Sequence, residues 1–196
     1  MQIPLAVVAE KLDAKRANEV LTELQRESDR GAALIGVSYL EEVLADLIRA
    51  HMIPGKCVEE LFERGALSNF SAQTNIAYFL GLIGKHVYDD LRKLRKIRNH
   101  FAHSSRPKRF ADDDIAAICR QLDLPGTLEG SSFHRARDQF CVTVACLTLQ
   151  FMEAARLVRN EVTQTSVNVP GRSIGGFEWV LTRVGQLPRV AGSRVN

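Results

Sequence analysis

Cysteine is scarce in this sequence, and the four cysteines occupy none of the patterns that bind metals. Cys57, Cys119, Cys141 and Cys146 form no CxxC pair and no CxxC arrangement with a histidine. Three of them lie in apolar helical runs, where a thiol behaves as a small hydrophobic side chain. We therefore expect four reduced, structural cysteines, no metal site and no cofactor.

Long apolar runs are also missing. No stretch approaches the roughly 20 apolar residues that span a bilayer, and residues 1–8 lack the basic flank and the length of a signal peptide. Repeats and low-complexity blocks are absent, while 45% of the 196 residues are hydrophobic. This composition predicts one soluble, cytoplasmic globular domain that does not contact a membrane.

Alternating strand patterns are not found, and apolar residues recur instead at the three- and four-residue steps of amphipathic helices. Such stripes occupy residues 34–47, 76–83 and 87–101, and the second stripe places Ile76, Phe79, Leu80 and Ile83 inside the protein. The longest helix is expected after Ser131-Ser132, which can cap it, and ends near Val162.

These patterns predict an all-α protein. Residues 1–162 form a compact up-and-down helical bundle, and residues 163–196 form a C-terminal tail that is loosely ordered or docks onto a partner. Pro54-Gly55 should end the first predicted helix, Ser71 should cap the second, and Ser104 to Pro107 should end the third. A short helix should follow Asp112 to Asp114 and finish before Leu124-Pro125-Gly126.

Positive charge is concentrated in residues 85–109, which carry nine basic and two acidic side chains, a net charge of +7 against +3 for the whole chain. Such a cluster can form an electrostatic footprint for nucleic acid. The predicted contacts are Arg92, Lys93, Arg95, Lys96, Arg106, Lys108 and Arg109. The alternative is a solvated helix face, since Asp89 and Asp90 at the start of this helix and basic residues at its end suit the helix macrodipole.

Three separated blocks resemble the mannitol operon repressor family. They are ESDRGAALI at residues 27–35, LSNFSA at 67–72 with LGLI at 80–83, and YDDL at 88–91 leading into IRNHFAH at 97–103. The resemblance covers roughly residues 20–160. It implies an all-helical, oligomeric protein that is associated with repression of a sugar-alcohol operon and lacks a recognised DNA-reading domain.

A second resemblance rests on Arg98, Asn99 and His103, which look like the motif of HEPN-type ribonucleases. Cleavage by the 2′-hydroxyl of RNA needs a base, an acid and a cation at the phosphate, and histidine and arginine can supply these groups. In keeping with that family's dimers, two protomers would provide two copies of His103. Five residues along an ideal helix turn about 500°, however, so Arg98 and His103 point about 140° apart unless the helix ends before His103. Asn99 and His103 share a face.

Both interpretations remain open at this point. The leading one is a regulatory protein of the mannitol operon repressor type that acts through protein contacts or weak, non-specific nucleic-acid contacts; the alternative is a metal-independent endoribonuclease. In the leading interpretation His103 is a structural residue in the last helical turn. A helix-turn-helix is hard to place, because residues 70–82 look too apolar for a major groove. The apolar seam from Phe140 to Val158 further predicts a homo-oligomer, most simply a dimer.

Overall fold

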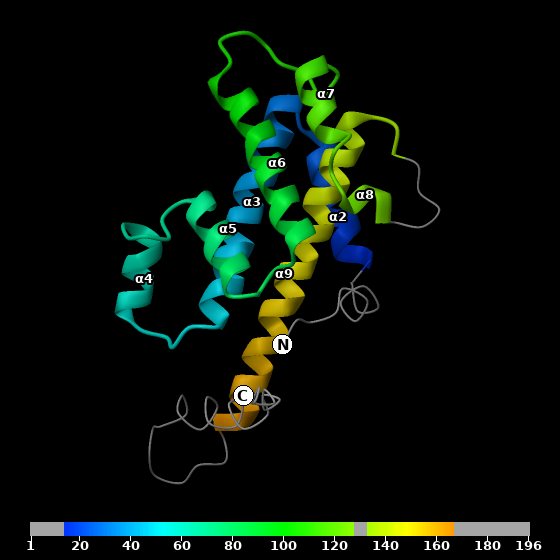
Figure 1. Cartoon of the computed structure of the whole chain (residues 1–196). Coiled ribbons are helices and arrows are strands. Elements are labelled where there is room, and N and C mark those ends of the chain that lie inside the picture. The colour runs from blue at the N-terminus through cyan, green and yellow to red at the C-terminus, as the bar shows by residue number, and fades with distance from the viewer. Residues whose placement is uncertain (1–13, 128–132, 167–196) are drawn as a thin grey trace, which may run out of the picture. The chain divides into compact units, whose positions relative to one another are not determined.

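The computed structural model describes residues 14–127 and 133–166, with side chains described for residues 19–125 and 133–159 (Figure 1). Its helices are α2 (Ala14–Arg26), α3 (Asp29–Ala50), α4 (Lys56–Glu63), α5 (Phe70–Phe79), α6 (Lys85–His103), α7 (Asp113–Cys119), α8 (Leu124–Thr127) and α9 (Ala136–Ser166). No strand occurs within these ranges. The predicted all-helical bundle is confirmed.

The chain divides into two compact units, Met1–Val158 and Arg159–Asn196. Most of the predicted tail, residues 167–196, and the predicted cap at residues 131–132 lie outside the described residues. The predicted boundary after residue 162 therefore stays a prediction.

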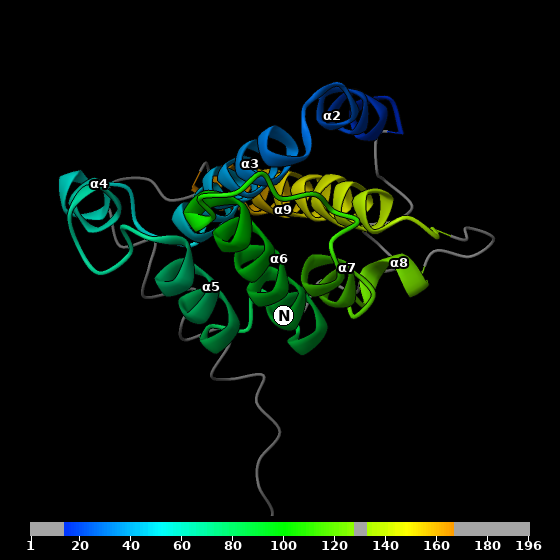
Figure 2. The same cartoon turned by 90° about the horizontal axis from the view of Figure 1, so that it is seen from above.

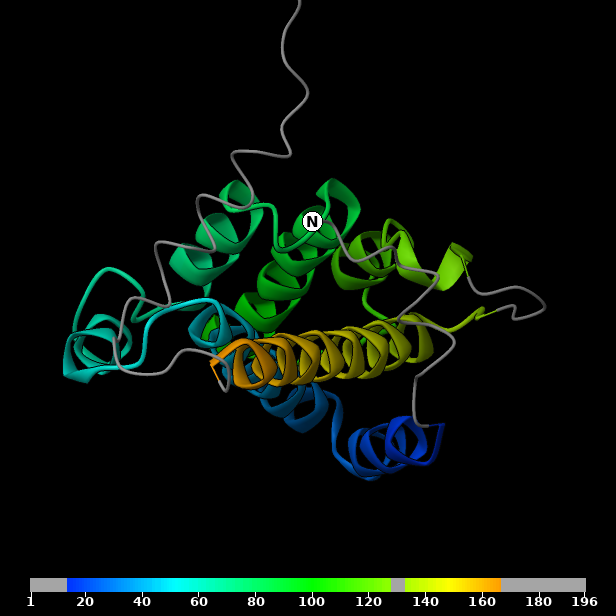
Figure 3. The ribbon, with the colours of Figure 1, turned by 90° about the horizontal axis from the view of Figure 1, so that it is seen from below.

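The core is built on α3 and α6, whose apolar stripes follow the predicted periods. Leu40 and Leu44 of α3 and Leu91 and Leu94 of α6 are completely buried. Helices α5, α6 and α7 lie side by side, with α3 and α9 packed behind them (Figures 2 and 3). Helix α6 is therefore flanked on two sides and covered behind, which leaves one long face exposed to solvent.

Helix α9 completes the core. Its stripe of Phe140, Val144, Leu147 and Phe151 is buried within the same chain, between 0% and 3% exposed. This part of the seam therefore gives no support to the predicted homo-oligomer, which stays a prediction. Residues Ala136–Arg159 are long and apolar enough to cross a membrane by composition, but 56% of the most apolar window is buried, as is usual for a core helix.

The α5–α6 turn departs from the periodic prediction. Phe79 is 74% exposed and Leu80 is 55% exposed, although both were expected inside. Helix α5 ends in a Schellman motif, in which Gly81 N–H bonds to Tyr78 O and Leu82 N–H bonds to Ala77 O, both at 2.9 Å. Gly81 adopts a φ of 70°, which glycine tolerates without strain. The chain reverses here, so the helical period no longer decides which side chains face inward.

Other boundaries also differ in detail. Asn69, not Ser71, caps α5, because its side chain accepts a hydrogen bond of 3.0 Å from the amide of Ala72. Helix α7 follows the predicted acidic start, but a further single turn, α8, begins at Leu124, where a helix breaker was expected. The short helix α4 was not predicted, since it buries only Val58 and Phe62.

Candidate functional site

The exposed face of α6 ends in an open cavity of about 360 Å³. Its lining residues are Lys96, Asn99, His100, His103, Ser104 and Lys108. The first four recur at positions i, i+3, i+4 and i+7 of α6, which places them on one side of the helix. Ile97 and Phe101 are buried on the opposite side, so the amphipathic pattern of α6 itself directs the polar side chains into the cavity.

The far wall of the cavity comes from the loop after α6. Lys108 donates a hydrogen bond of 2.8 Å to Oδ2 of Asp114 at the start of α7, and Nδ1 of His100 lies 3.3 Å from the same oxygen. The hydrogen bond from Lys108 holds the pKa of Asp114 below its usual value, and the same bond raises the pKa of Lys108. Asp114 thus ties Lys108 and His100 together without lining the cavity itself.

A long-range contact sets the path of this loop. The amide of Phe110 donates a hydrogen bond of 2.9 Å to Asp29 at the start of α3, and the Phe110 ring packs between Phe101 and Phe140 at centroid distances of 4.9 and 5.0 Å. Arg137 of α9 forms an ion pair with Asp29 from the other side. The loop that supplies Lys108 is therefore anchored to the core.

The three residues of the predicted ribonuclease motif are not brought together within one chain. Asn99 and His103 line the cavity, as their shared helical face predicted. Arg98 does not line it, because α6 continues through His103 and the angular separation of about 140° is kept. The His103 side chain is exposed and forms no hydrogen bond to the described helix end; the long bond of 3.5 Å to the carbonyl of Ala102 comes from Arg30 instead.

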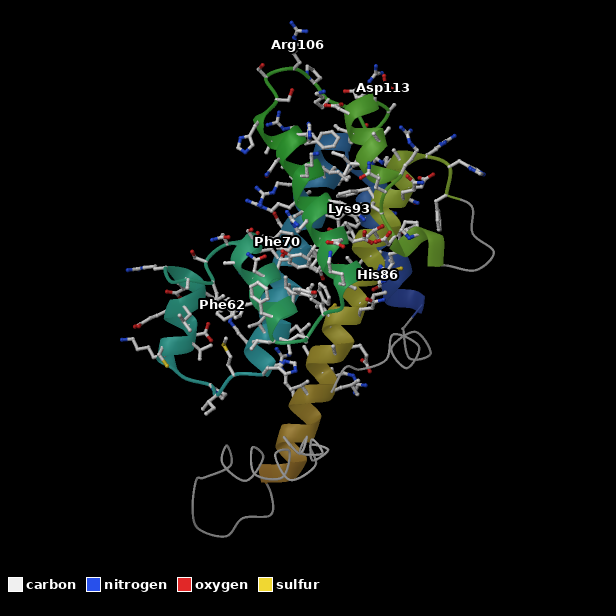
Figure 4. The ribbon with its side chains drawn as sticks, in the orientation of Figure 1. Phe62, Phe70, His86, Lys93, Arg106 and Asp113 are labelled. Carbon is white, nitrogen blue, oxygen red and sulfur yellow. The ribbon has the colours of Figure 1, made fainter. Side chains whose placement is uncertain are left out.

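The predicted nucleic-acid contacts fall into two groups. Lys93 bonds to Asp90, Asp123 and the carbonyl of Gln121, and Lys108 bonds to Asp114, so these two cations are already paired. The side chains of the remaining predicted cations form no ion pair with the described residues; they are Arg92, Arg95, Lys96, Arg106 and Arg109. Figure 4 shows Lys93 on α6. It also shows Arg106 in the loop after α6, at the same end of the bundle as Asp113.

Comparison with known proteins shows the family to which the chain belongs. Residues 18–167 match the family described as MtlR, mannitol repressor. The chain belongs to the mannitol repressor family. A solved structure described as the X-ray structure of the MtlR-HPr complex from Escherichia coli is similar, with a TM-score of 0.57 and 20% sequence identity over 70% of this chain and 99% of that chain. At this identity the likeness shows the fold. No curated protein sequence matches the chain.

In this mannitol repressor family member, the three blocks that carry the family resemblance lie where helices are capped or joined. Ser28 in the first block caps α3 by accepting a hydrogen bond of 3.0 Å from Gly31 N–H. In the second block the Leu67 carbonyl accepts a hydrogen bond of 2.9 Å from the side chain of Gln73. In the third block Asp90 is buried, and it accepts bonds from Lys93 and from the amides of Asp123 and Leu124 where α8 begins. At these positions the blocks stabilise the fold, whereas residues 99–103 of the third block supply part of the cavity lining.

Two residues of the cavity were missed as candidates by sequence reasoning. His100 lies four residues after Lys96, and this spacing alone could have placed it beside Lys96 on α6. Ser104 had no such signal, because it lines the cavity only through the turn in which its hydroxyl donates to Arg106 O at 2.8 Å.

Proposed function

We propose that this protein is a cytoplasmic regulator of the mannitol repressor type, which acts by binding a protein partner and makes weak, sequence-independent contacts with nucleic acid. Membership of the family supports the regulatory role. A protein of the same fold is described in a complex with HPr, which supports a protein partner of that kind for this chain. A homo-oligomer remains part of the proposal.

The observation that carries the nucleic-acid contact is the row of unpaired cations on α6 and its following loop. Paired cations gain little from a phosphate, because their neutralising partner must first be displaced. Arg92 and Arg95 are exposed on α6, and Arg106 and Arg109 are exposed on the loop; all four lack an ion pair with the described residues. These side chains are free to replace counterions at a phosphate backbone.

The arrangement of the helices favours contact with the phosphate backbone of nucleic acid and disfavours recognition of the base sequence. A helix that reads sequence enters a major groove about 12 Å wide, which admits little more than the helix itself. Helix α6 is flanked by α5 on one side and α7 on the other (Figure 2). Neither neighbour could follow it into the groove, so the exposed cations of α6 would meet phosphates only.

Fluorescence anisotropy with labelled duplexes of equal length and unrelated sequence tests this contact. We expect equal affinities for all duplexes and an affinity that falls steeply with salt. Replacing Arg92 and Arg95 together with alanine should reduce the salt slope by about 1 to 2. The matched control replaces Lys56 and Arg64, two exposed cations at α4, and should leave the slope unchanged. Strong preference for one operator sequence at high salt would contradict the proposal.

Calorimetric titration with purified HPr tests the protein partner. We expect saturable binding to the folded chain, and absence of any binding heat and of complex formation on gel filtration would reject HPr as the partner. Light scattering tests the oligomer: a stable mass of 21.8 kDa at micromolar concentration would show a monomer.

The second candidate function is a metal-independent endoribonuclease of HEPN type. It is favoured by one observation, the presence of both Asn99 and His103 in the cavity. Such an enzyme should cleave single-stranded RNA in EDTA and leave 2′,3′-cyclic phosphate ends. Activity that disappears in both His103→Ala and Arg98→Ala would support it, and intact RNA after incubation with wild-type protein would reject it. Arg98 lies outside this cavity, so its participation would require a second protomer.

A further inference from the structure

The cavity at the end of α6 has a one-sided chemistry. Each of its six lining residues carries a hydrogen-bond donor, and no carboxylate lines it. Among the described residues, the acidic group bonded to this wall is Asp114, which is already bonded to Lys108 and close to His100. Most of the exposed lining surface is carbon, however, so the lining suits an oxygen-rich anion that is joined to a carbon-containing group.

The donors that remain available come from two elements. Lys96, Asn99 and His103 form no hydrogen bond or ion pair with other described residues, and they project from one face of α6. Lys108 uses one of its three protons on Asp114 and approaches from the loop. The hydroxyl of Ser104 is committed to the backbone of Arg106. Three unused side chains and a partly used lysine thus converge from two sides.

The helix end itself opposes an anion, since the C-terminal turn carries a partial charge of about −0.5. Lys96 alone exceeds this charge in magnitude. Lys108 and Asp114 together are close to neutral, and His103 offers a ring N–H as a further donor. The local balance therefore remains favourable to a negative ligand.

The size of the cavity narrows the class of ligand. Its volume of about 360 Å³ lies at the lower end of the roughly 300–1,000 Å³ range of small-molecule sites. A lone phosphate ion would leave most of this space to water. We propose that the cavity binds a small phosphate monoester, with the phosphoryl group held by Lys96, Asn99 and His103 and the remainder of the ligand facing Lys108 and Ser104. This proposal goes beyond the regulatory function and does not depend on it.

Isothermal titration with glucose 6-phosphate, with inorganic phosphate and with glucose tests the site at constant ionic strength. We expect saturable binding of the two phosphates, with one site for each chain, and no binding of glucose. Lys96→Ala should weaken phosphate binding about tenfold or more, the effect of losing one charge-assisted hydrogen bond. His103→Ala should weaken it by a smaller factor. The control Lys56→Ala removes the same charge from an exposed lysine of α4, which lies 3.9 Å from Glu60, and should leave the affinity unchanged.

Three results would overturn the proposal. The first is the absence of saturable phosphate binding to wild-type protein with a normal circular dichroism spectrum. The second is an equal loss of affinity in Lys96→Ala and Lys56→Ala, which would indicate attraction by overall charge. The third is binding of a short single-stranded RNA that depends on Lys96 and is not displaced by glucose 6-phosphate, which would assign the cavity to nucleic acid. The test of Arg92 and Arg95 is separate, so either proposal can fail alone.

Discussion

Replacing Asp90 with alanine would remove a buried junction between α6 and the segment before α8. The Asp90 side chain is almost completely buried and accepts hydrogen bonds from the amides of Asp123 at 3.0 Å and Leu124 at 3.0 Å. It also pairs with Lys93 at 3.0 Å. Partial burial alone would lower the pKa of Lys93, but the hydrogen bonds and charges of Asp90 and Asp123 together outweigh this effect and the pKa is raised.

The size of the loss follows from what the substitution leaves behind. Lys93 keeps Asp123 and the carbonyl of Gln121 as partners, so its charge is not stranded. The two amides lose a buried acceptor, at about 1–3 kcal/mol each. Asp123 is exposed, so water can partly replace the acceptor that its amide loses. We therefore expect Asp90→Ala to lower the free energy of unfolding by about 2–4 kcal/mol, less than the full sum for two buried amides. Asp90→Asn keeps an acceptor and the side-chain volume, so it should lose less.

Urea unfolding followed by far-UV circular dichroism at pH 7 measures this loss. The neighbouring substitution Asp89→Asn is the matched control, because Asp89 forms a surface ion pair with Lys85, and such pairs contribute at most about 1 kcal/mol. An Asp90→Ala variant no less stable than Asp89→Asn would show that the junction does not stabilise the fold, and would refute the reasoning.

Three further predictions concern the surface and the buried thiols. At pH 8 a disulfide reagent should modify one cysteine of the native protein quickly, and Cys57→Ser should abolish this fast phase, because burial raises the pKa of the other three thiols, to about 12 for Cys119. Lys108→Met should raise the pKa of Asp114 toward 3.8, which NMR titration would measure. In the wild type, the Lys108–Asp114 pair stabilises the folded state above pH 3.8. This stabilisation is lost as the pH falls through the lower pKa that Asp114 has in the folded state. His103→Ala should change the stability by less than about 0.5 kcal/mol in urea unfolding, since His103 is exposed and makes no hydrogen bond to the described helix end.

The parts of the fold that could be predicted are those fixed by local periodicity. The stripe that includes Leu91, Leu94 and Phe101 repeats over four turns, and each of these side chains is buried as expected. Phe79 and Leu80 fit the same period, but Phe79 is the last residue of α5 and Leu80 is its C-cap. The hydrogen bonds of the turn at Gly81 reverse the chain there. A period is informative only while the helix continues, and the signal that α5 ends at Phe79 is Gly81, because glycine commonly follows a helix end in a left-handed conformation.

The candidate site was also predictable only where helical spacing decides which side chains lie together. The spacing of Asn99 and His103 placed them on one face, and the structure puts both in the cavity. The contribution of Lys108 depends on Asp29, which binds the loop from 81 residues away in the sequence. Pairing of this kind is decided by the tertiary fold, so the charge run could not show that Lys93 and Lys108 are already neutralised while Arg92 and Arg95 are not.

The helix end at His103 decides what the Arg98-to-His103 motif can mean. Had α6 ended one turn earlier, the chain could have curved so that Arg98 and His103 faced one phosphate. The helix includes His103 and is capped by Ser104 in an extended conformation, so the arginine stays outside the cavity that contains the histidine. Within one chain, the cation of α6 that lines the cavity with His103 is Lys96, seven residues earlier. Any phosphate chemistry or binding at this cavity must therefore depend first on Lys96, and Lys96→Ala is a more informative substitution there than Arg98→Ala.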